Sequence, residues 1–430
     1  MMRTGPTEAV DQRPAEDPQR IERHRKGFTQ GTHRLIAPEE TLARVEKLLP
    51  VLGITRIANV TGLDKIGIPV VMVCRPNSRS VSVSQGKGVS LAAAKASGVM
   101  ESIESFHAER VAHPLRLGSH EDLRYGEAMI DVAGLPRPAD SLYTPFARLL
   151  WIVGRDLFTD RPLWLPYEMV HLDFTLPLPS GHGCFAANSN GLASGNHILE
   201  AVSHAICELI ERDATTLWHC GGEAAEARTR IDLDTVDDPP CRALLDRFAA
   251  AGVLAAAWET TSDIGVPAFL CRILEDVPPP RSTYRPASGM GCHPAREVAL
   301  ARALTEAAQS RLTFISGARD DMSRGEYAEY LRPETYALWR ARMAGSGGRD
   351  FAAGPGRYAT SLEDDVAWLL ARLRAVGMTQ AAVVDLTRPE FGVPVARVVI
   401  PGLEGVDGSP RYRPGARARR VTAAKDGPAA

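Results

Sequence analysis

The sequence predicts an α+β fold, in which layers of helix and sheet pack around shared cores. Helix candidates with apolar residues at helical spacing and strand candidates formed by short apolar runs are both numerous. Their order along the chain follows no clean βαβ rhythm, which argues against a doubly wound parallel sheet.

The first half of the chain begins with a helix expected at 37–53, where Pro38 stands near the start and Gly53 follows the end. Next come a buried strand, a strand that runs into a glycine-rich turn, a long helix of small residues and a further strand. In this order they are expected at 68–76, 78–88, 91–111 and 150–157.

The second half opens with a long apolar helix at 198–219 that carries several acidic residues. The remaining helices are expected at 242–252, 296–317 and 362–377, and the remaining strands at 254–261, 267–274, 380–387 and 393–401. Residues 1–26 are polar and are expected to be a flexible arm. The basic, proline-containing tail at 409–430 is expected to be disordered.

The composition bounds the function. The 430 residues are 44% hydrophobic and 24% charged, as in ordinary globular proteins, and the net charge of -2 gives no footprint for nucleic acid or an anionic membrane. No apolar run approaches the roughly 18 residues that span a bilayer, and the N-terminus has no apolar signal core. We expect a cytoplasmic protein. Seven scattered cysteines without a Cys-x-x-Cys pair argue against a disulfide framework or a structural zinc site.

One pattern occurs three times: a glycine-rich segment, which we expect to be a turn, precedes a helix with polar residues at helical spacing. The glycine-rich segments are 84–88, 188–196 and 289–294. Residues three or four apart lie on one helical face, so each helix carries a polar stripe. The stripes are Ser97, Glu101 and Glu104, then Glu200, His204, Glu208 and Glu211, then Arg302, Glu306 and Gln309.

Two interpretations of the stripes compete. The ordinary one is a solvated face on an amphipathic helix. Against it, the stripes are almost purely acidic, and glycine-rich turns before helices favour bound anions. We infer phosphates near the turns and Mg²⁺ between phosphates and carboxylates, with Lys87, Arg212 and Arg302 as a phosphate clamp. No segment matches GxxxxGK[ST] or GxGxxG.

Other arrangements are weaker. Glu104 and His107 have the Glu-x-x-His spacing of di-iron bundles, but that motif should occur twice. His204 is a candidate metal ligand, although we expect a hydrogen-bonding histidine. His182 and Cys184 suggest a nucleophile pair, but we expect a loop there.

Four stretches resemble the YcaO family: SQGKG with AAAKASGVMESIES, NSNGLASGNHILEAVSHAICELIERDA, ALARALTEAAQSR and VPVARVVIPGLEG. The similarity covers 27–408, which is the expected YcaO domain. GTHRLIAPEETLARV and GITRIANVTGLDKIGIPVVMVCRPN further resemble the subgroup that accompanies TfuA proteins. The resemblance implies a YcaO fold, with sheets and helices in a pseudo-symmetric arrangement around a central ATP–Mg²⁺ site, and a homodimer.

YcaO proteins use ATP and Mg²⁺ to activate a peptide-backbone amide, so the resemblance implies an enzyme with both cofactors. The implied metal-binding carboxylates are Glu101, Glu104, Glu208, Glu211 and Glu306. With Lys87 from the clamp, the implied nucleotide contacts are Arg34, Thr41, Ser97, Asn196, Glu200, Arg212 and Arg302. Glu208, Glu211 and Arg302 form the expected catalytic set.

The resemblance leaves the product open. Sulfide as the nucleophile gives a thioamide, whereas a Cys, Ser or Thr side chain of the substrate gives an azoline ring. Azoline-forming members usually end in a PxPxP tail, whereas this chain ends RVTAAKDGPAA. Residues 1–26 are also too short for a fused leader-binding domain. Both features favour thioamide formation. We expect thioamide formation in a ribosomally made peptide or protein, with a TfuA-like partner. A cyclodehydratase and a non-catalytic nucleotide-binding scaffold are the alternatives.

Overall fold

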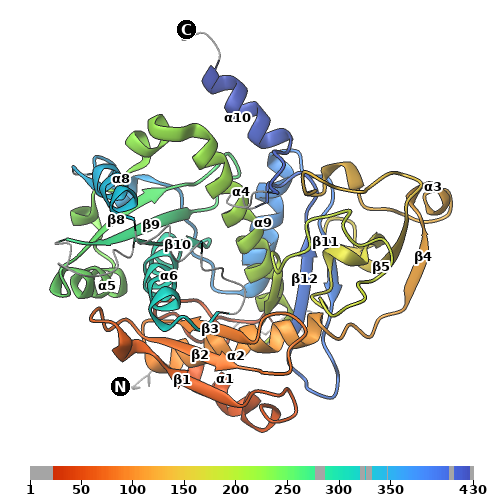
Figure 1. Cartoon of the computed structure of the whole chain (residues 1–430), viewed down its shortest axis with the longest axis horizontal. Helices are drawn as coiled ribbons and strands as arrows, with labels where there is room; N and C mark the ends of the chain where they lie inside the picture. The colour runs from red at the N-terminus through yellow and green to blue at the C-terminus, as the bar shows by residue number, and fades with distance from the viewer. Residues whose placement is uncertain are drawn as a thin grey trace, which may run out of the picture.

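The computed structural model describes residues 23–276, 286–319, 325, 332–345, 347–405 and 411–426. The named strands in these ranges form three sheets, and every ladder between them is antiparallel. Helices cover and separate the sheets, which confirms the expected α+β fold (Figure 1). None of the helices described is both long and apolar enough to cross a bilayer.

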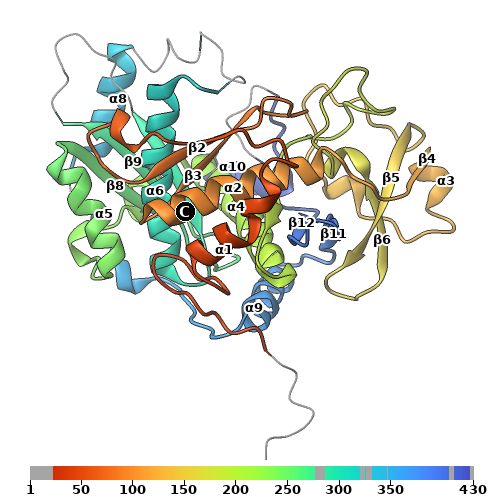
Figure 2. The same ribbon diagram turned by 90° about the horizontal axis from the view of Figure 1, so that it is seen from below.

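The first sheet has the strand order β1-β2-β3 and lies close to helices α1 and α2, as Figure 2 shows. Its central strand is buried on both faces. Val71 and Val73 pack in the core that includes α2, whereas Val70 and Met72 pack with Leu312 of α6. The bounds are β1 Arg56–Asn59, β2 Val70–Cys74, β3 Val83–Lys87, α1 Pro38–Val45 and α2 Leu91–Ala108.

The second sheet has the order β10-β9-β8, and every residue of β9 is buried. Phe269 and Cys271 face the core shared with α5 and α6, whereas Leu270 packs with Trp218 of α4. This central strand therefore has one apolar layer on each face. The bounds are β8 Val253–Glu259, β9 Ala268–Glu275, β10 Ala287–Cys292, α4 Ile198–Thr229, α5 Pro239–Ala250 and α6 Arg296–Ser316.

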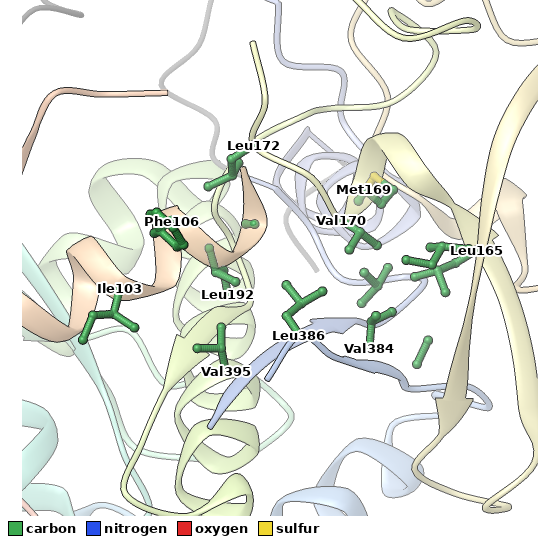
Figure 3. Packing of buried hydrophobic residues seen from close by; sticks show 14 of the residues in the cluster. Ile103, Phe106, Leu165, Met169, Val170, Leu172, Leu192, Val384, Leu386 and Val395 are labelled. Atoms are coloured by element: carbon green, nitrogen blue, oxygen red, sulfur yellow. The ribbon is translucent and has the colours of Figure 1, made fainter. Parts of the chain in front are cut away.

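The third sheet has the order β4-β5-β11-β12-β7, with β6 added to β5. Figure 3 shows Ile103 and Phe106 of α2 in the same apolar cluster as Val384 and Val395 of this sheet. The strands are β4 Leu115–Ser119, β5 Arg148–Asp156, β6 Pro162–Pro166, β7 Leu192–Ser194, β11 Ala382–Asp385 and β12 Val395–Val399. The other helices are α3 His120–Leu123, α8 Pro333–Met343, α9 Leu362–Ala375 and α10 Ala416–Asp426. Single 3₁₀ turns lie at Glu46–Leu48, Thr61–Leu63, Val132–Gly134, Tyr167–Met169, Leu233–Thr235 and Phe351–Ala353.

Three strand–helix units form the centre of the molecule: β3 with α2, β7 with α4, and β10 with α6. Each helix contacts its own strand and also the strand of the next unit, so that α2 touches β7, α4 touches β10 and α6 touches β3. The three units therefore close into a ring. The polar stripes predicted from the sequence lie on these three helices.

Two of the three expected glycine-rich turns are strands instead. Gly86 lies within β3, and Gly289 and Gly291 lie within β10. A Cβ at Gly86 would lie 1.9 Å from the Ala94 carbonyl oxygen, and one at Gly291 would lie 2.0 Å from that of Ala299. These glycines let the helix approach the strand backbone closely, rather than supply a turn. Gly191, with a φ of 78°, does stand in a turn.

The expected disorder at both ends needs correction where the structure describes it. Residues 1–22 lie outside the described ranges, but Lys26 forms a buried ion pair with Asp365 at 2.6 Å. In the tail, Ala416–Asp426 is helix α10, and Arg417 pairs with Asp213 of α4 at 2.9 Å. A basic, proline-containing composition suggested disorder because the sequence does not show the buried carboxylate that neutralises Arg417.

Candidate functional site

The three central units repeat one hydrogen bond. In each unit, a helix glutamate accepts the backbone N–H of a residue in or just before its own strand. The sequence separations are 16, 17 and 16 residues: Gln85 to Glu101 at 3.5 Å, Gly191 to Glu208 at 3.1 Å and Met290 to Glu306 at 3.1 Å. The three carboxylates therefore occupy equivalent places in the ring, which the four- and three-residue spacing of the stripes indicated.

A second carboxylate follows one turn later on two of the helices. Glu104 accepts the N–H of Ser194 at 2.8 Å and its hydroxyl at 2.7 Å, which ties α2 to strand β7. Glu211 is almost completely buried, and its Oε2 atom has no hydrogen-bond partner in the described ranges. The third helix carries Gln309 at this place.

Burial and mutual repulsion disfavour the charged forms of Glu101, Glu104 and Glu211. Burial raises the pKa of Glu104 to about 8, and the nearby Glu101 and Glu208 add to the shift. Burial likewise raises the pKa of Glu101 to about 7, although Lys87 partly opposes it. The pKa of Glu211 is also raised by burial, against the opposing effect of Arg212, and Glu306 adds repulsion. The glutamates of all three helices thus influence one another electrostatically.

Two side-chain cations lie among the carboxylates. Lys87, at the end of β3, forms an ion pair with Glu306, and Arg212 lies 3.6 Å from Glu208 and 3.5 Å from Glu211. Burial would raise the pKa of Glu306, but Lys87 and Arg212 outweigh it and lower that pKa.

The predicted tight metal cluster is not formed. Within the described ranges, no three His, Cys, Asp or Glu side chains are grouped closely enough to hold a metal ion as they stand. Instead the five predicted glutamates divide between backbone N–H groups and the two cations. Like charges separate unless a cation lies between them, which accounts physically for the spread.

The N-terminal segment docks against the start of α4. Buried Glu200 accepts the N–H of Leu35 at 2.9 Å and lies 3.4 Å from the Arg34 guanidinium. The side-chain amide of Asn196 donates to the Thr41 hydroxyl at 3.0 Å. The predicted residues Arg34, Thr41, Asn196 and Glu200 are therefore brought together, although the first two lie far from the last two in sequence.

His204 lies between two arginines. Arg34 approaches its Nδ1 at 3.0 Å and Arg302 approaches its Nε2 at 3.2 Å. Burial lowers the pKa of His204 well below its usual value, and both guanidiniums lower it further. A neutral imidazole accepts at only one nitrogen, so one of the two arginines keeps an unused donor here. His204 is thus the hydrogen-bonding histidine that the sequence predicted.

Ser97, His204 and Arg302 stand at equivalent places in the ring, each four residues before the glutamate that accepts the backbone N–H of its own unit. Ser97 is half-buried on α2, one turn from Glu101. The Nε atoms of Arg302 and Arg212 are buried without a partner in the described ranges. These unpaired Nε donors are therefore available to an anionic ligand, which could accept hydrogen bonds from them.

Arg397, which lies in the middle of β12 and is fully buried, was not predicted from the sequence as a functional residue. Its Nε donates to the Met169 carbonyl at 2.8 Å, its NH2 donates to the Asn188 carbonyl at 2.7 Å, and its NH1 has no partner in the described ranges. Burial lowers the pKa of Arg397 to about 10, with Glu208 partly opposing the shift. The available signal was an arginine inside the apolar run VPVARVVIP, because arginine is rarely buried without a role.

The weaker sequence candidates do not assemble into sites. His107 uses Nδ1 on the Ile103 carbonyl at 2.7 Å and packs against Phe106 and Phe391, so it does not join Glu104 as a ligand. Cys184 lies in a loop, and burial raises its pKa to about 11, which disfavours a nucleophilic thiolate. All seven cysteines are free thiols.

Comparison with known proteins decides the family. Residues 85–404 match the family described as YcaO cyclodehydratase, ATP- and Mg²⁺-binding. The chain belongs to the YcaO family. An uncharacterized protein in the tfuA 3′ region of Rhizobium leguminosarum bv. trifolii is 36% identical over 398 residues, which are 91% of this chain and 93% of that protein. An uncharacterized Methanothermobacter thermautotrophicus protein is 35% identical, over 86% of this chain and 94% of its own.

Two solved structures share the YcaO fold. YcaO from Methanopyrus kandleri, bound with AMPPCP and Mg²⁺, superposes with a TM-score of 0.71 at 23% identity, over 91% of this chain and 100% of that chain. A heterocyclase in complex with substrate and cofactor gives a TM-score of 0.77 at 22% identity, over 95% of this chain. This chain spans only 57% of that heterocyclase. The expected fold is therefore confirmed, and ATP and Mg²⁺ are the cofactors of the family.

Proposed function

We propose that this YcaO protein uses ATP and Mg²⁺ to activate a peptide-backbone amide and that it forms a thioamide. The observation that carries the ATP- and Mg²⁺-dependent part is the ring of three strand–helix units, which repeats one half-buried, backbone-bonded glutamate per unit in a chain of this family. The relative in the tfuA 3′ region supports the thioamide and a TfuA-like partner.

The residues present fit the two cofactors. Raised pKa values at Glu101, Glu104 and Glu211 mean that a divalent cation would relieve repulsion that protons otherwise relieve. Magnesium, when bound, would neutralise phosphate charge. We assign it to Glu101, Glu104, Glu208, Glu211 and Glu306. We assign the nucleotide to Arg34, Thr41, Lys87, Ser97, Asn196, Glu200, Arg212 and Arg302.

The chemistry explains why cationic side chains line the site. A sulfide nucleophile adds to the amide carbon, and the carbonyl oxygen becomes an oxyanion. That oxygen attacks the γ-phosphorus of ATP and ADP leaves. Loss of the phosphorylated oxygen as phosphate, with loss of the sulfur-bound proton, forms the C=S bond. Lys87, Arg212 and Arg302 would hold the phosphates while Glu208 and Glu211 keep the site charge-balanced, so positioning and neutralisation do most of the work.

Cyclodehydration is the second candidate, because the family description names it. In that reaction a Cys, Ser or Thr side chain of the substrate supplies the nucleophile, and the peptide loses one water. Thioamide formation instead replaces one oxygen by one sulfur. In both reactions the oxyanion of a tetrahedral adduct is phosphorylated by ATP, and only the added nucleophile differs, so the site alone does not separate them.

Peptide mass separates the two functions. The purified chain, a TfuA-like protein encoded beside its gene, Mg²⁺-ATP, sulfide and a peptide encoded beside the same gene would be incubated together. Replacement of oxygen by sulfur supports our proposal, and loss of water without sulfide supports the cyclodehydratase. If wild-type protein binds no Mg²⁺-ATP in a calorimeter, a non-catalytic scaffold becomes the better description.

A further inference from the structure

Helix α4 is interrupted where it leaves the central site, and a cavity lies beside the interruption. Gly222 has a φ of 61° and a ψ of -152°, a conformation open essentially to glycine alone. The adjoining cavity has a volume of about 500 Å³. It is lined by Trp218, His219, Gly222, Glu223, Ala224, Glu226, Arg272, Arg342 and Lys425.

The cavity is connected to the carboxylate ring by two elements. Gly222 lies ten residues after Arg212 on α4, about 15 Å along a helix. On the sheet side, Arg272 pairs with Ser288 of β10, two residues before Met290, whose N–H binds Glu306. Figure 1 shows the end of α4 and α10 on the side of the molecule opposite α1 and α2.

Arg272 forms the buried wall of this cavity and has few polar partners. Its guanidinium lies 5.4 Å from the ring centroid of Trp218, 5.0 Å from that of Trp258 and 5.6 Å from that of Trp339. Among the described residues it makes one hydrogen bond, from NH1 to Glu226 at 3.1 Å. Four of its five N–H donors therefore lack a described acceptor, although the residue is only 6% exposed.

The charges around the cavity favour one negative group. The described lining holds three cations, Arg272, Arg342 and Lys425, against two carboxylates, Glu223 and Glu226. Glu226 is shared, because Arg342 also lies 3.9 Å from it. Burial lowers the pKa of Arg272, and Glu226 opposes this shift.

We propose that this cavity, about 15 Å along α4 from Arg212 of the ring, binds a carboxylate-bearing segment of the peptide substrate. The excess of a single positive charge suits a carboxylate better than a phosphate dianion, which the two lining glutamates would repel. A volume of about 500 Å³ accommodates more than one side chain. The assignment of the carboxylate to the substrate rests on the proposed function.

Direct binding tests the site without any catalytic readout. The full-length protein would be titrated, without ATP, with a blocked pentapeptide that has one central glutamate, and binding followed by tryptophan fluorescence. The matched glutamine peptide and inorganic phosphate serve as comparison ligands. We expect the glutamate peptide to bind at least about fivefold tighter than the glutamine peptide, because only it places a charge on Arg272.

The variants are chosen on the exposed rim so that folding is preserved. Arg342→Ala and Lys425→Ala should each weaken binding of the glutamate peptide about threefold to fivefold. Arg340→Ala is the matched control on the same helix, because Arg340 pairs with Asp276 and does not line the cavity. It should bind the peptide like the wild type.

Three results would overturn the assignment: equal binding of the glutamate and glutamine peptides, tighter binding of inorganic phosphate than of either peptide, or an equal loss in Arg340→Ala. Failure of the proposed function is distinguishable, because Mg²⁺-ATP binding at the carboxylate ring is measured separately and should be unchanged in Arg342→Ala. A protein that binds the glutamate peptide but turns over no ATP would keep the cavity assignment and lose the catalytic one.

Discussion

Glutamates that are fully or partly buried occur in two kinds of surroundings in this molecule. Outside the ring, Glu109 accepts two hydrogen bonds of 2.6 Å from Arg75, and Glu259 accepts hydrogen bonds of 2.6 and 3.0 Å from Arg296. Inside the ring, Glu101 and Glu104 are half-buried and receive hydrogen bonds mainly from backbone N–H groups and a serine.

The pKa values of the two groups move in opposite directions. The paired arginines outweigh burial and lower the pKa values of Glu109 and Glu259, whereas burial raises those of Glu101 and Glu104. A carboxylate that serves the fold is thus neutralised by its own side-chain partner. A carboxylate that lacks such a partner is suited to a cation from solution.

The largest effect is expected from Glu211→Gln. This change should reduce Mg²⁺-ATP turnover about 10³-fold, because it removes a proposed metal ligand from a site that acts by charge neutralisation. Thermal unfolding should be unchanged or slightly higher, because a neutral amide removes buried repulsion. Normal turnover in this variant would remove Glu211 from the site.

Glu109→Gln should show the reverse behaviour. It leaves Arg75 as an unpaired buried cation, which costs roughly 3–5 kcal/mol of unfolding free energy. Turnover per folded molecule should be unchanged, because Glu109 lies outside the ring. Denaturant unfolding and a turnover assay on the same preparation would measure both, and a turnover defect without a stability defect would contradict the comparison.

The pH dependence of stability should also separate the two groups. Without Mg²⁺, the folded state holds protons on Glu101 and Glu104 up to pKa values of about 7 and about 8, whereas the unfolded state releases them near the ordinary value of 4.5. The folded state therefore binds more protons in between, so stability should fall as the pH rises from about 5 to about 8, by up to about 1.4 kcal/mol per pH unit for each group.

Saturating Mg²⁺ should flatten this fall, since the ion replaces the protons, and the apparent Mg²⁺ affinity should rise over the same interval. Urea unfolding at several pH values, with and without Mg²⁺, would measure how the free energy of unfolding changes with pH in each case. A double variant, Glu101→Gln with Glu104→Gln, is the control and should lose most of the slope. A wild-type slope that Mg²⁺ leaves unchanged would argue against metal at these residues.

A smaller effect is expected at Arg397, whose guanidinium binds the backbone carbonyls of Met169 and Asn188. Arg397 binds the Asn188 carbonyl in the turn whose Gly191 N–H holds Glu208. Arg397→Lys keeps the charge but not both hydrogen bonds, so it should weaken the apparent Mg²⁺ affinity about tenfold, as loss of an outer-shell partner does. Unchanged Mg²⁺ dependence together with a lower melting temperature would show a purely structural arginine.

The periodic features were predictable from the sequence. The stripes on α2, α4 and α6 follow from helical spacing, and the expected helix at 296–317 agrees with α6 at Arg296–Ser316. The predictions that failed concern residues whose conformation depends on packing between elements. Glycines at 86 and 289 looked like turns because their helix neighbours are not visible in the local sequence, and the tail looked disordered because its partner Asp213 lies about 200 residues away.

The site was predicted in its parts and not in its arrangement. Resemblance and spacing supplied the five glutamates, but the sequence does not show that Lys87 pairs with Glu306 or that Arg212 lies between Glu208 and Glu211. Lys87 comes from strand β3, and Arg212 directly follows Glu211 on α4. Their place depends on how the three units close into a ring.

A crystal structure of this protein with Mg²⁺ and a non-hydrolysable ATP analogue would show whether the ring of three strand–helix units holds both ligands. We predict magnesium bound by glutamates of the ring at oxygen distances of about 2.1 Å, with Lys87 moved from Glu306 to a phosphate. The assignment of Mg²⁺ and ATP to the ring is wrong if the nucleotide binds elsewhere and no metal lies between the three helices. In that case Lys87 and Arg212 would keep their carboxylate partners.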